Sequence, residues 1–380
     1  MSGLDVFAVE DTSAQICWRR LPALGAVLRV GDVQVPLDDH DPAGPGAVVV
    51  EGLEPDADHE LVLEVAGRRH ATARLRTLAP PPGRLLSRFA TISDLHIGER
   101  AFGLLPRVRE SPAPPPGEGY SLRCARAAIA EVNAWGAEAL VVKGDLTFSG
   151  RPKQWELVAD VLAEATMPVY ATLGNHDVVP KSADGRDTLG RAGVGIGDEP
   201  VALDLPGIVV VVGHSAVAGR PQGRVDDPHR EALVRLTAGG GGPAFVALHH
   251  YGDRLPLPSR YPPGIPRRQA EALLRALAEA NPATMVSFGH THRNRRGTRH
   301  GLVVTEVGST KDYPGVWAGY AVHEGGIRQV LRRVSDPGCL AWTDKTRRVL
   351  GGLWGLWSPG LLTWRCFSHP WPAGRGAVAR

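Results

Sequence analysis

The sequence contains few cysteines, little net charge and no long apolar run, and each scarcity excludes a class of protein. Its four cysteines form no CxxC pair, so neither a disulfide framework nor a thiolate metal site is expected, with a bond between Cys339 and Cys366 left open as the alternative. The net charge of +3 is too small to indicate a specific nucleic-acid partner. No run approaches the ~18 apolar residues of a transmembrane segment, and the first residues lack the pattern of a secretory signal. A cytoplasmic protein is therefore expected.

The first 79 residues have the pattern of a small all-β sandwich. Short β-like runs at 13–19, 25–30, 47–50 and 60–66 alternate with turn signals and show no helical period. The segments at 12–18, 52–55 and 75–78 resemble those of a fibronectin type III domain. A proline-rich linker follows, which we place at 80–84.

From Leu85 onward, apolar strands alternate with helical periods, which is typical of an α/β domain. Helices are expected over 121–135, 154–165, 228–236 and 266–280, the first of them capped by Ser121. We assign this domain to residues 85–335. A tail at 336–380 holds five of the nine tryptophans, and it is expected to pack onto this α/β domain as a cap. A homodimer contact and a membrane-interface role are the alternatives for the tail.

Five of the expected strands end in polar residues that a hydrophobic core does not need. In open α/β sheets, ligands bind at the carboxyl ends of the strands, so these residues converge on one pocket if the strands are neighbours. The residues are Asp94 and His96, then Asp145, then Asn175, His176 and Asp177, then His249 and His250, and finally His290 and His292.

These side chains are oxygen and imidazole donors without a thiolate. Such a set suits Mn, Fe or Zn better than Mg or Ca, which prefer shells made only of oxygen. A carboxylate between imidazoles can bridge two metal ions, which can share a hydroxide nucleophile and neutralise phosphoryl oxygens. The pattern therefore predicts a two-metal hydrolase.

Five sequence blocks resemble the calcineurin-like metallophosphoesterase superfamily in the family's order. They are DLH at 94–96, GD at 144–145, GNHD at 174–177, HH at 249–250 and GHTH at 289–292. The resemblance covers about residues 85–335 and implies a sandwich of two mixed β-sheets flanked by helices. It also implies that the first metal ion is held by Asp94, His96 and His292, the second by Asn175, His249 and His290, and that Asp145 bridges them.

The same resemblance implies roles for two further residues. His176 would face the substrate, protonating the leaving oxygen or stabilising the transition state, and Asp177 would orient it. For the pair at 249–250 the family favours His249 as the ligand, with His250 behind it. His214 ends another strand, where it contacts substrate or is simply a buried histidine. The run at 293–296 either binds phosphate or is a solvated loop.

The blocks look most like class III cyclic nucleotide phosphodiesterases. We therefore expect a metal-dependent phosphodiesterase whose small-molecule substrate is cyclic AMP or cyclic GMP. Phosphomonoesters, glycerophosphodiesters and nucleotide pyrophosphates remain alternatives, and a non-catalytic binding scaffold is a more remote one. The front domain is similar to that of purple acid phosphatases, but Phe148 stands where their tyrosine ligand would follow Asp145.

Overall fold

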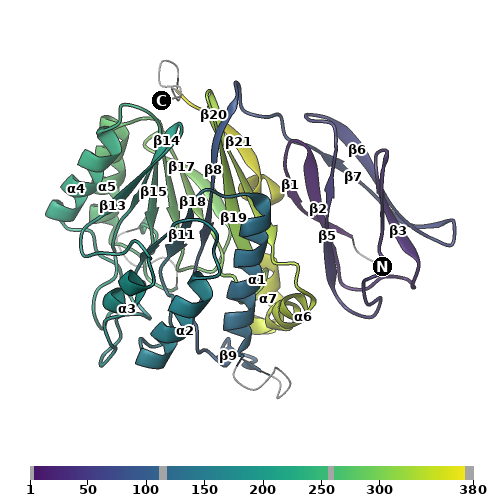
Figure 1. Ribbon diagram of the computed structural model, residues 1–380, viewed down its shortest axis with the longest axis horizontal. Coiled ribbons are helices and arrows are strands. Elements are labelled where there is room, and N and C mark those ends of the chain that lie inside the picture. The colour runs from purple at the N-terminus through teal and green to yellow at the C-terminus, as the bar shows by residue number, and fades with distance from the viewer. Residues whose placement is uncertain (1–3, 111–117, 256–260, 373–380) are drawn as a thin grey trace.

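The computed structural model describes residues 4–110, 118–255 and 261–372, and its N-terminal part consists of two antiparallel sheets (Figure 1). One sheet has the order β1-β2-β5 and the other β4-β3-β6-β7. The strands are β1 (Asp5–Val9), β2 (Ser13–Trp18), β3 (Ala26–Val30), β4 (Val33–Pro36), β5 (Gly46–Glu51), β6 (Asp58–Val65) and β7 (Arg68–Arg76). The all-β expectation is confirmed. The sequence pattern did not predict strand β7, because this edge strand is mostly polar and exposed.

Two six-stranded sheets form the larger part of the molecule. Their orders are β12-β11-β8-β19-β20-β21 and β13-β14-β15-β16-β18-β17, and each contains parallel and antiparallel pairs. The first consists of β8 (Leu85–Ile92), β11 (Leu140–Lys143), β12 (Val169–Thr172), β19 (Val316–His323), β20 (Gly326–Arg333) and β21 (Phe367–Pro370). The second consists of β13 (Val201–Leu205), β14 (Ile208–Val212), β15 (Ala244–Leu248), β16 (Thr284–Phe288), β17 (Arg295–Arg299) and β18 (Leu302–Glu306). The expected sandwich of two mixed sheets is confirmed.

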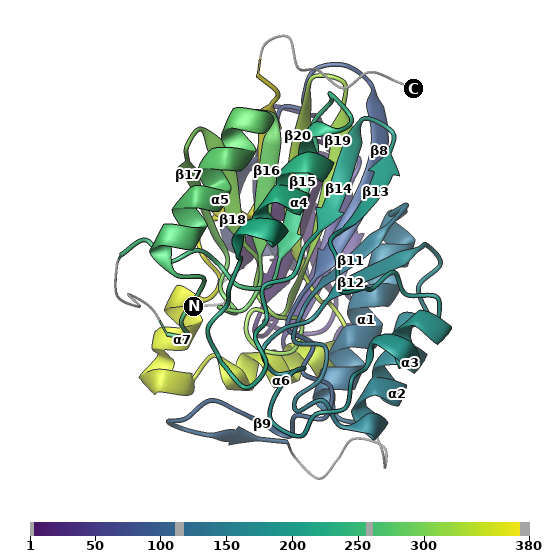
Figure 2. The same ribbon diagram turned by 90° about the vertical axis from the view of Figure 1, so that its left-hand side faces the viewer.

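Helices cover the outer faces of both sheets (Figure 2). They are α1 (Tyr120–Trp135) and α2 (Pro152–Leu162) on the first sheet, and α4 (Asp227–Ala238) and α5 (Arg267–Ala280) on the second, with a short α3 (Arg186–Arg191) near α2. All four expected helices are present. The prediction that Ser121 caps α1 is wrong, because Gly119 has the extended backbone of an N-cap residue and Ser121 lies inside the helix.

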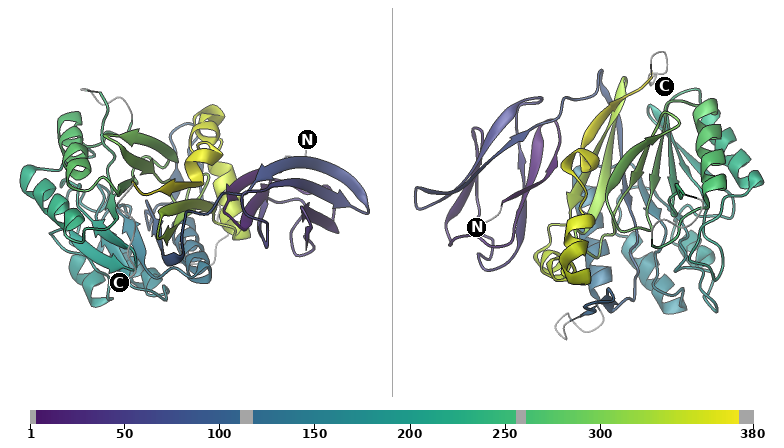
Figure 3. Two further views of the ribbon diagram at one scale, coloured as in Figure 1. Left: turned by 90° about the horizontal axis from the view of Figure 1, so that it is seen from above. Right: turned by 180° about the vertical axis from the view of Figure 1, so that it is seen from behind.

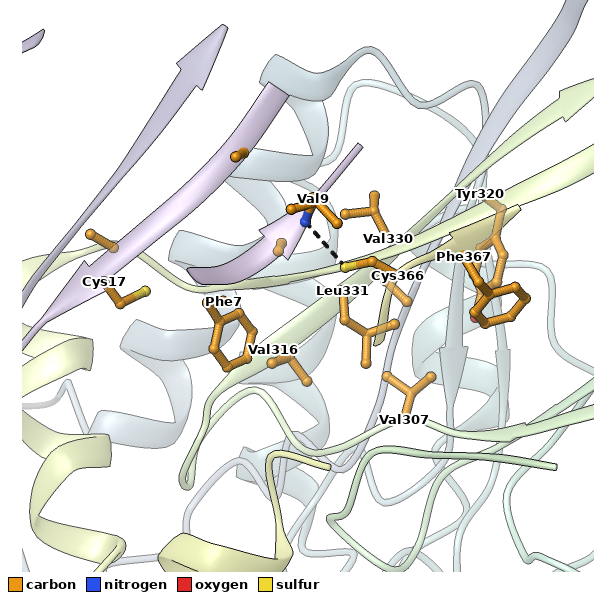
Figure 4. Packing of buried hydrophobic residues seen from close by; sticks show 14 of the residues in the cluster. Phe7, Val9, Cys17, Val307, Val316, Tyr320, Val330, Leu331, Cys366 and Phe367 are labelled. Carbon is orange, nitrogen blue, oxygen red and sulfur yellow. Dashed lines mark hydrogen bonds between the residues drawn. The ribbon is translucent and has the colours of Figure 1, made fainter. Parts of the chain in front are cut away.

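The core between the two sheets is aromatic and continues into the N-terminal sheets. Phe89 stacks on Tyr320 at 4.7 Å, and Phe245 meets both rings edge-on. In Figure 4, Phe7 and Val9 of β1 lie beside the residues of β20 and the C-terminal segment, and the Val9 amide donates to the Cys366 sulfur at 3.4 Å. The N-terminal and central apolar cores are therefore one continuous cluster.

Polar contacts also join the N-terminal sheets to β20. The side-chain amide of Gln15 donates to the Arg333 carbonyl at 2.7 Å and accepts from the Arg333 amide at 2.8 Å. Glu10 accepts from Arg328 at 3.0 Å and also pairs with Arg332. These contacts are buried, so the first strands are held firmly against the larger sandwich.

The C-terminal segment packs between the N-terminal sheets and the larger sandwich (Figure 3). It consists of α6 (Pro337–Thr346), the 3-10 turn η1 (Val349–Gly352), α7 (Leu353–Trp357), α8 (Leu362–Arg365) and β21. Trp342, Trp354 and Trp371 are buried, whereas Trp357 is exposed. The part of the predicted tail at 373–380 lies outside the described residues.

Two further sequence readings are settled by this packing. The run at 293–296 is not a solvated loop, because Arg295 and Arg296 enter β17 and lie over the rings of Trp364 and Phe367 in the C-terminal segment. All four cysteines are buried free thiols, so the alternative disulfide does not form. Among the described residues, the helices are too short or too polar to cross a membrane.

Candidate metal centre

The five polar clusters lie together at one end of the molecule, at the seam between the two six-stranded sheets. Three of the clusters follow strands of the first sheet, β8, β11 and β12. The other two follow strands of the second sheet, β15 and β16. The clusters therefore do not line one sheet edge, as a single open sheet would place them. They meet because parallel strands of both sheets point their carboxyl ends in the same direction.

One group of donors forms around His96. Its Nε2 lies 3.2 Å from Nε2 of His292, and that nitrogen lies 3.5 Å from Oδ1 of Asp94. Asp94 is fully buried, and His96 is almost so. Three donors within one ion's reach make this group able to hold a metal ion.

A second group forms around His249. Its Nε2 lies 3.1 Å from Nδ1 of His290 and 3.3 Å from the side-chain oxygen of Asn175. His249 is fully buried and His290 almost so. The structure thus brings together the residues that were expected to hold a second ion.

Asp145 lies between the two groups. A single carboxylate oxygen, Oδ2, is 3.4 Å from Nε2 of His96 and 3.4 Å from Nε2 of His249. The other oxygen, Oδ1, accepts the backbone amide of His176 at 2.8 Å, which fixes the plane of the carboxylate. An oxygen shared by two donor groups is positioned to bridge two cations.

The ring nitrogens of the second group fit a metal ion better than they fit one another. Nδ1 of His249 faces the Lys143 carbonyl at 2.8 Å, and Nε2 of His290 faces the Pro263 carbonyl at 3.0 Å. Because a carbonyl only accepts, each ring places a hydrogen outward, and in the neutral ring the inward nitrogen carries a lone pair. Two lone pairs 3.1 Å apart need a positive charge between them. The site therefore fits a divalent cation.

The ionisation differs from one ring to the next. Burial lowers the pKa of His290 to about 3, so this ring is neutral near pH 7. Burial also acts on His249, but the carboxylate of Asp145 outweighs it and raises the pKa of His249 to about 9. Burial, together with the nearby Lys311, holds the pKa of His96 well below its usual range. Imidazoles beside a carboxylate are a typical metal-binding combination, and the positive charge that Asp145 favours at His249 is one that a metal ion would supply in place of a proton.

The backbone at the donors is strained. Asp94, His96, Asp145, His290 and His292 all have positive φ angles, between 46° and 68°. These five are half of the ten non-glycine residues with positive φ in the described chain. Such conformations cost free energy, persist only where the surrounding structure enforces them, and concentrate at functional sites.

Two motif glycines are required by close approach to the donors. A Cβ on Gly174 would stand 2.1 Å from Oδ1 of Asp145, and a Cβ on Gly289 would stand 2.0 Å from the Ser93 hydroxyl. That hydroxyl donates to Asp94 at 2.5 Å. Gly174 therefore lets the turn after β12 approach the loop after β11, and Gly289 lets the segment after β16 approach the end of β8 across the seam between the sheets.

His176 stands at the mouth of the site, beside His96. The two rings meet edge-on at 4.5 Å, and Nδ1 of His176 donates to the Phe148 carbonyl at 3.0 Å. Its remaining nitrogen, Nε2, is available to a substrate. Phe148 takes part through its backbone, while its side chain is partly exposed.

Asp177 does not orient the His176 ring, contrary to expectation. Its carboxylate accepts the backbone amides of Leu146, Thr147 and Gly174 and the Thr147 hydroxyl, at 2.8–3.1 Å. Burial and the neighbouring Asp145 raise the pKa of Asp177 to about 6. It thus joins the loop after β11 to the turn after β12 and holds the two segments that carry Asp145 and Asn175.

Sequence reasoning missed Asp312. Its fully buried carboxylate accepts from Nδ1 of His292 at 2.6 Å and lies 3.6 Å from the Lys311 ammonium, which also pairs with Glu99. The available signal was a sixth strand end, since β18 leads into the loop that carries Asp312. A carboxylate behind a ligand histidine fixes its tautomer and raises its basicity.

His250 and His214, whose roles the sequence left open, have different surroundings. His250 is fully buried, contacts the Ser215 hydroxyl through Nδ1 at 2.9 Å, and stands in a group with His249 and His290 that could also hold a metal ion. His214 contacts the Thr172 hydroxyl at 3.0 Å through Nδ1. Burial, with a contribution from its neighbour His229, lowers the pKa of His214 to about 4. His214 thus adjoins the end of β12, and His250 adjoins the second donor group.

Comparison with known proteins places this geometry in a family. A probable cyclic nucleotide phosphodiesterase of Psychrobacter sp. (strain PRwf-1) is 24% identical over 178 residues, which are 45% of this chain and 51% of that protein. The chain thus spans about half the length of this curated relative. A purple acid phosphatase from yellow lupin (Lupinus luteus) seeds is 11% identical, with a TM-score of 0.44 over 88% of this chain and 73% of that one. PhoD is 10% identical, with a TM-score of 0.43 over 87% of each chain.

A family model described as calcineurin-like phosphoesterase matches residues 87–294, which are more than half of the chain and include all the donors described above. The N-terminal sheets lie outside this match. The chain therefore belongs to the calcineurin-like phosphoesterases.

Proposed function

We propose that this chain is a two-metal phosphodiesterase that hydrolyses cyclic nucleotides. Metal-dependent hydrolysis of phosphoesters is the chemistry of its family. The observation that carries the two-metal proposal is the carboxylate oxygen of Asp145, which lies equally far from a histidine of each donor group. The similarity to a probable cyclic nucleotide phosphodiesterase supports the choice of substrate class.

We assign the ligands as the sequence predicts. Asp94, His96 and His292 hold one ion, Asn175, His249 and His290 hold the other, and Asp145 bridges them. The ions, when bound, supply positive charge that neutralises the phosphoryl oxygens and activates water for attack. The inward imidazole nitrogens and the buried carboxylates are suited to Mn, Fe or Zn.

His176 is the residue that we expect to act on the leaving group. Since its Nδ1 hydrogen points to the Phe148 carbonyl, a second proton can reside only on Nε2, which faces the mouth of the site. From there the ring donates this proton to the leaving oxygen as the phosphorus–oxygen bond breaks. Asp177 keeps the turn that carries His176 against the loop after Asp145.

We also infer the organisation of the chain. Residues 85–335 carry the phosphoesterase, and residues 1–79 pack against it as a supporting layer. The described part of the tail adds helices and the edge strand β21 to the first six-stranded sheet.

The test is turnover of the protein reconstituted with Mn²⁺, using a bis-aryl phosphodiester, cyclic AMP and an aryl phosphomonoester. Cleavage of both diesters, lost in Asp145→Asn and retained in Asp160→Asn, would support the proposal. Asp160 is a suitable control because it is an exposed aspartate on α2. Dominant hydrolysis of the monoester would overturn it, and cleavage of the aryl diester alone would refute the cyclic nucleotide assignment. Metal binding without turnover of any phosphoester would favour a non-catalytic scaffold.

A further inference from the structure

Exposed apolar side chains gather beside the metal centre. The described chain has twelve exposed large hydrophobic residues, and eight of them lie on the β9–β10 hairpin, at position 261 and at 350–361 of the C-terminal segment. We call these eight residues the apolar rim: Leu104, Leu105, Tyr261, Leu350, Leu353, Leu356, Trp357 and Leu361. Single exposed apolar residues are ordinary, but a concentration of them marks an interaction surface.

The segments of the rim are tied to one another. The hairpin of β9 (Ala101–Phe102) and β10 (Val108–Arg109) carries Leu104 and Leu105 at its tip. The Leu350 amide donates to the Leu105 carbonyl at 2.6 Å, which joins the hairpin to η1. The hairpin and α7 both lie at the lower end of the molecule in Figures 1 and 2. The rim is therefore one surface rather than scattered positions.

The rim is also tied to the metal centre. Phe102 stacks on the ring of His292 at 6.1 Å and meets Trp354 of α7 at 5.6 Å. The Asn294 amide, two residues after His292, donates to the Ser358 carbonyl at 2.9 Å. Arg293 lies over Trp354 and donates to the Tyr261 carbonyl at 3.2 Å. The exposed side chains thus stand next to the GHTH segment.

The short helix α7 is apolar on both faces. Trp354 is 7% exposed and faces inward, where it fills the contact with Phe102. Leu353, Leu356 and Trp357 are 43%, 73% and 46% exposed and face outward. A surface helix usually presents polar residues to water, so this outer face has the composition of a buried contact.

The charges around the rim are mainly positive. Arg107 and Arg109 lie on the hairpin and Arg348 precedes η1, and all three are exposed. In the described part of the chain none of them forms an ion pair, whereas the nearby Glu99 and Glu110 pair with Lys311 and Arg100. Past Arg348 lies a cleft of about 840 Å³, and its lining includes Arg19, Arg20, Lys345 and Arg347 against the carboxylates of Asp5 and Asp344.

We infer that the apolar rim docks on the surface of an anionic lipid bilayer. Leucine and tryptophan side chains enter the boundary between headgroups and acyl chains, and unpaired arginines beside them attract anionic headgroups. Tryptophan in particular favours a boundary that is apolar on one side and wet on the other. The opening of the metal centre would then face the headgroup layer.

The test is sedimentation of the full chain with vesicles of phosphatidylcholine alone or of phosphatidylcholine mixed with phosphatidylglycerol. We expect binding to the anionic vesicles and a loss of affinity of about tenfold or more in the double variant L356S/W357S. Leu24→Ser is the matched control, since Leu24 is 68% exposed in the loop between β2 and β3. We expect R107Q/R109Q to weaken binding to the anionic vesicles, and Arg74→Gln, on the exposed edge strand β7, to leave it unchanged.

Two results would overturn this inference. One is equal sedimentation of wild type and L356S/W357S with anionic vesicles. The other is a wild-type protein that does not sediment with vesicles and forms a dimer, while the double variant is monomeric. In that case a second copy of the chain would cover the apolar rim. Thermal unfolding verifies that the variants fold. Repeating the sedimentation with Asp145→Asn separates docking from the proposed function, since docking needs no turnover.

Discussion

Replacing Asp312 by asparagine tests how far the metal centre depends on a residue behind its ligands. The carboxylate accepts a 2.6 Å hydrogen bond from Nδ1 of His292 and is fully buried. Although burial acts against it, this carboxylate raises the pKa of His292, so it increases the affinity of the ring for positive charge. Asparagine keeps the shape and one acceptor but removes the charge. Lys311 keeps its partner Glu99, so the substitution leaves no ammonium group unpaired.

The expected magnitude follows from this contact. Loss of a charge-assisted partner behind a ligand costs roughly 10–100-fold in metal affinity. At about 1.4 kcal/mol for each factor of ten, this is roughly 1.4–2.8 kcal/mol, which agrees with the ~1.5–3 kcal/mol of a hydrogen bond to a charged group. Turnover at saturating Mn²⁺ should largely recover, because the ligands themselves are retained.

The assay is calorimetric titration with Mn²⁺ after dialysis against a chelator, together with turnover measured against Mn²⁺ concentration. Asp344→Asn serves as the control, since that carboxylate pairs with Arg333 at 3.3 Å and does not touch the donors. If Asp312→Asn folds with an unchanged melting temperature and binds Mn²⁺ as tightly as the wild type, the reasoning is refuted.

Three further substitutions test other parts of the structure. Gly174→Ala forces a Cβ to within 2.1 Å of Asp145, so the metal content should fall and the free energy of unfolding should drop by ~1–3 kcal/mol. Gly190→Ala, which has open space around the new Cβ, should change neither quantity. Elemental analysis measures the metal content, and thermal unfolding measures the stability. His176→Ala should keep its metals and lose ~10²–10⁴-fold in turnover; unchanged turnover would remove its assigned role. Gln15→Ala leaves a buried amide and carbonyl of β20 unpaired and should lower the free energy of unfolding by ~1–3 kcal/mol in urea titration, unless water replaces the lost contacts.

Much of the fold was predictable because its apolar runs are long and regular. The buried strand at 244–248 and the helix at 267–280 both read clearly. The edge strand β7 did not, because an exposed strand needs few apolar residues and its position depends on its partner β6. Local pattern alone cannot reveal such a strand.

The residues of the candidate site also divide into those that the sequence predicted and those that it did not. The motif residues were found because polar groups at strand ends are unusual, and the structure brings all seven expected ligands together. Asp312 was missed because its contact with His292 joins two loops 20 residues apart in sequence. The actual partners of Asp177 were also hidden, since they are backbone amides that only the folded turn presents to it.

Each of the two donor groups draws its residues from both sheets, and this affects how the chain folds. Asp94 and His96 follow β8 of the first sheet, while His292 follows β16 of the second, so neither sheet alone can complete the site. An ion bound there stabilises only the assembled sandwich, by about 2.7 kcal/mol at a concentration one hundred times its dissociation constant. During synthesis, the first sheet's donors emerge long before the second sheet's histidines. Final metal capture therefore waits until the two sheets have met, which makes metal loading a late step that reports on completed folding.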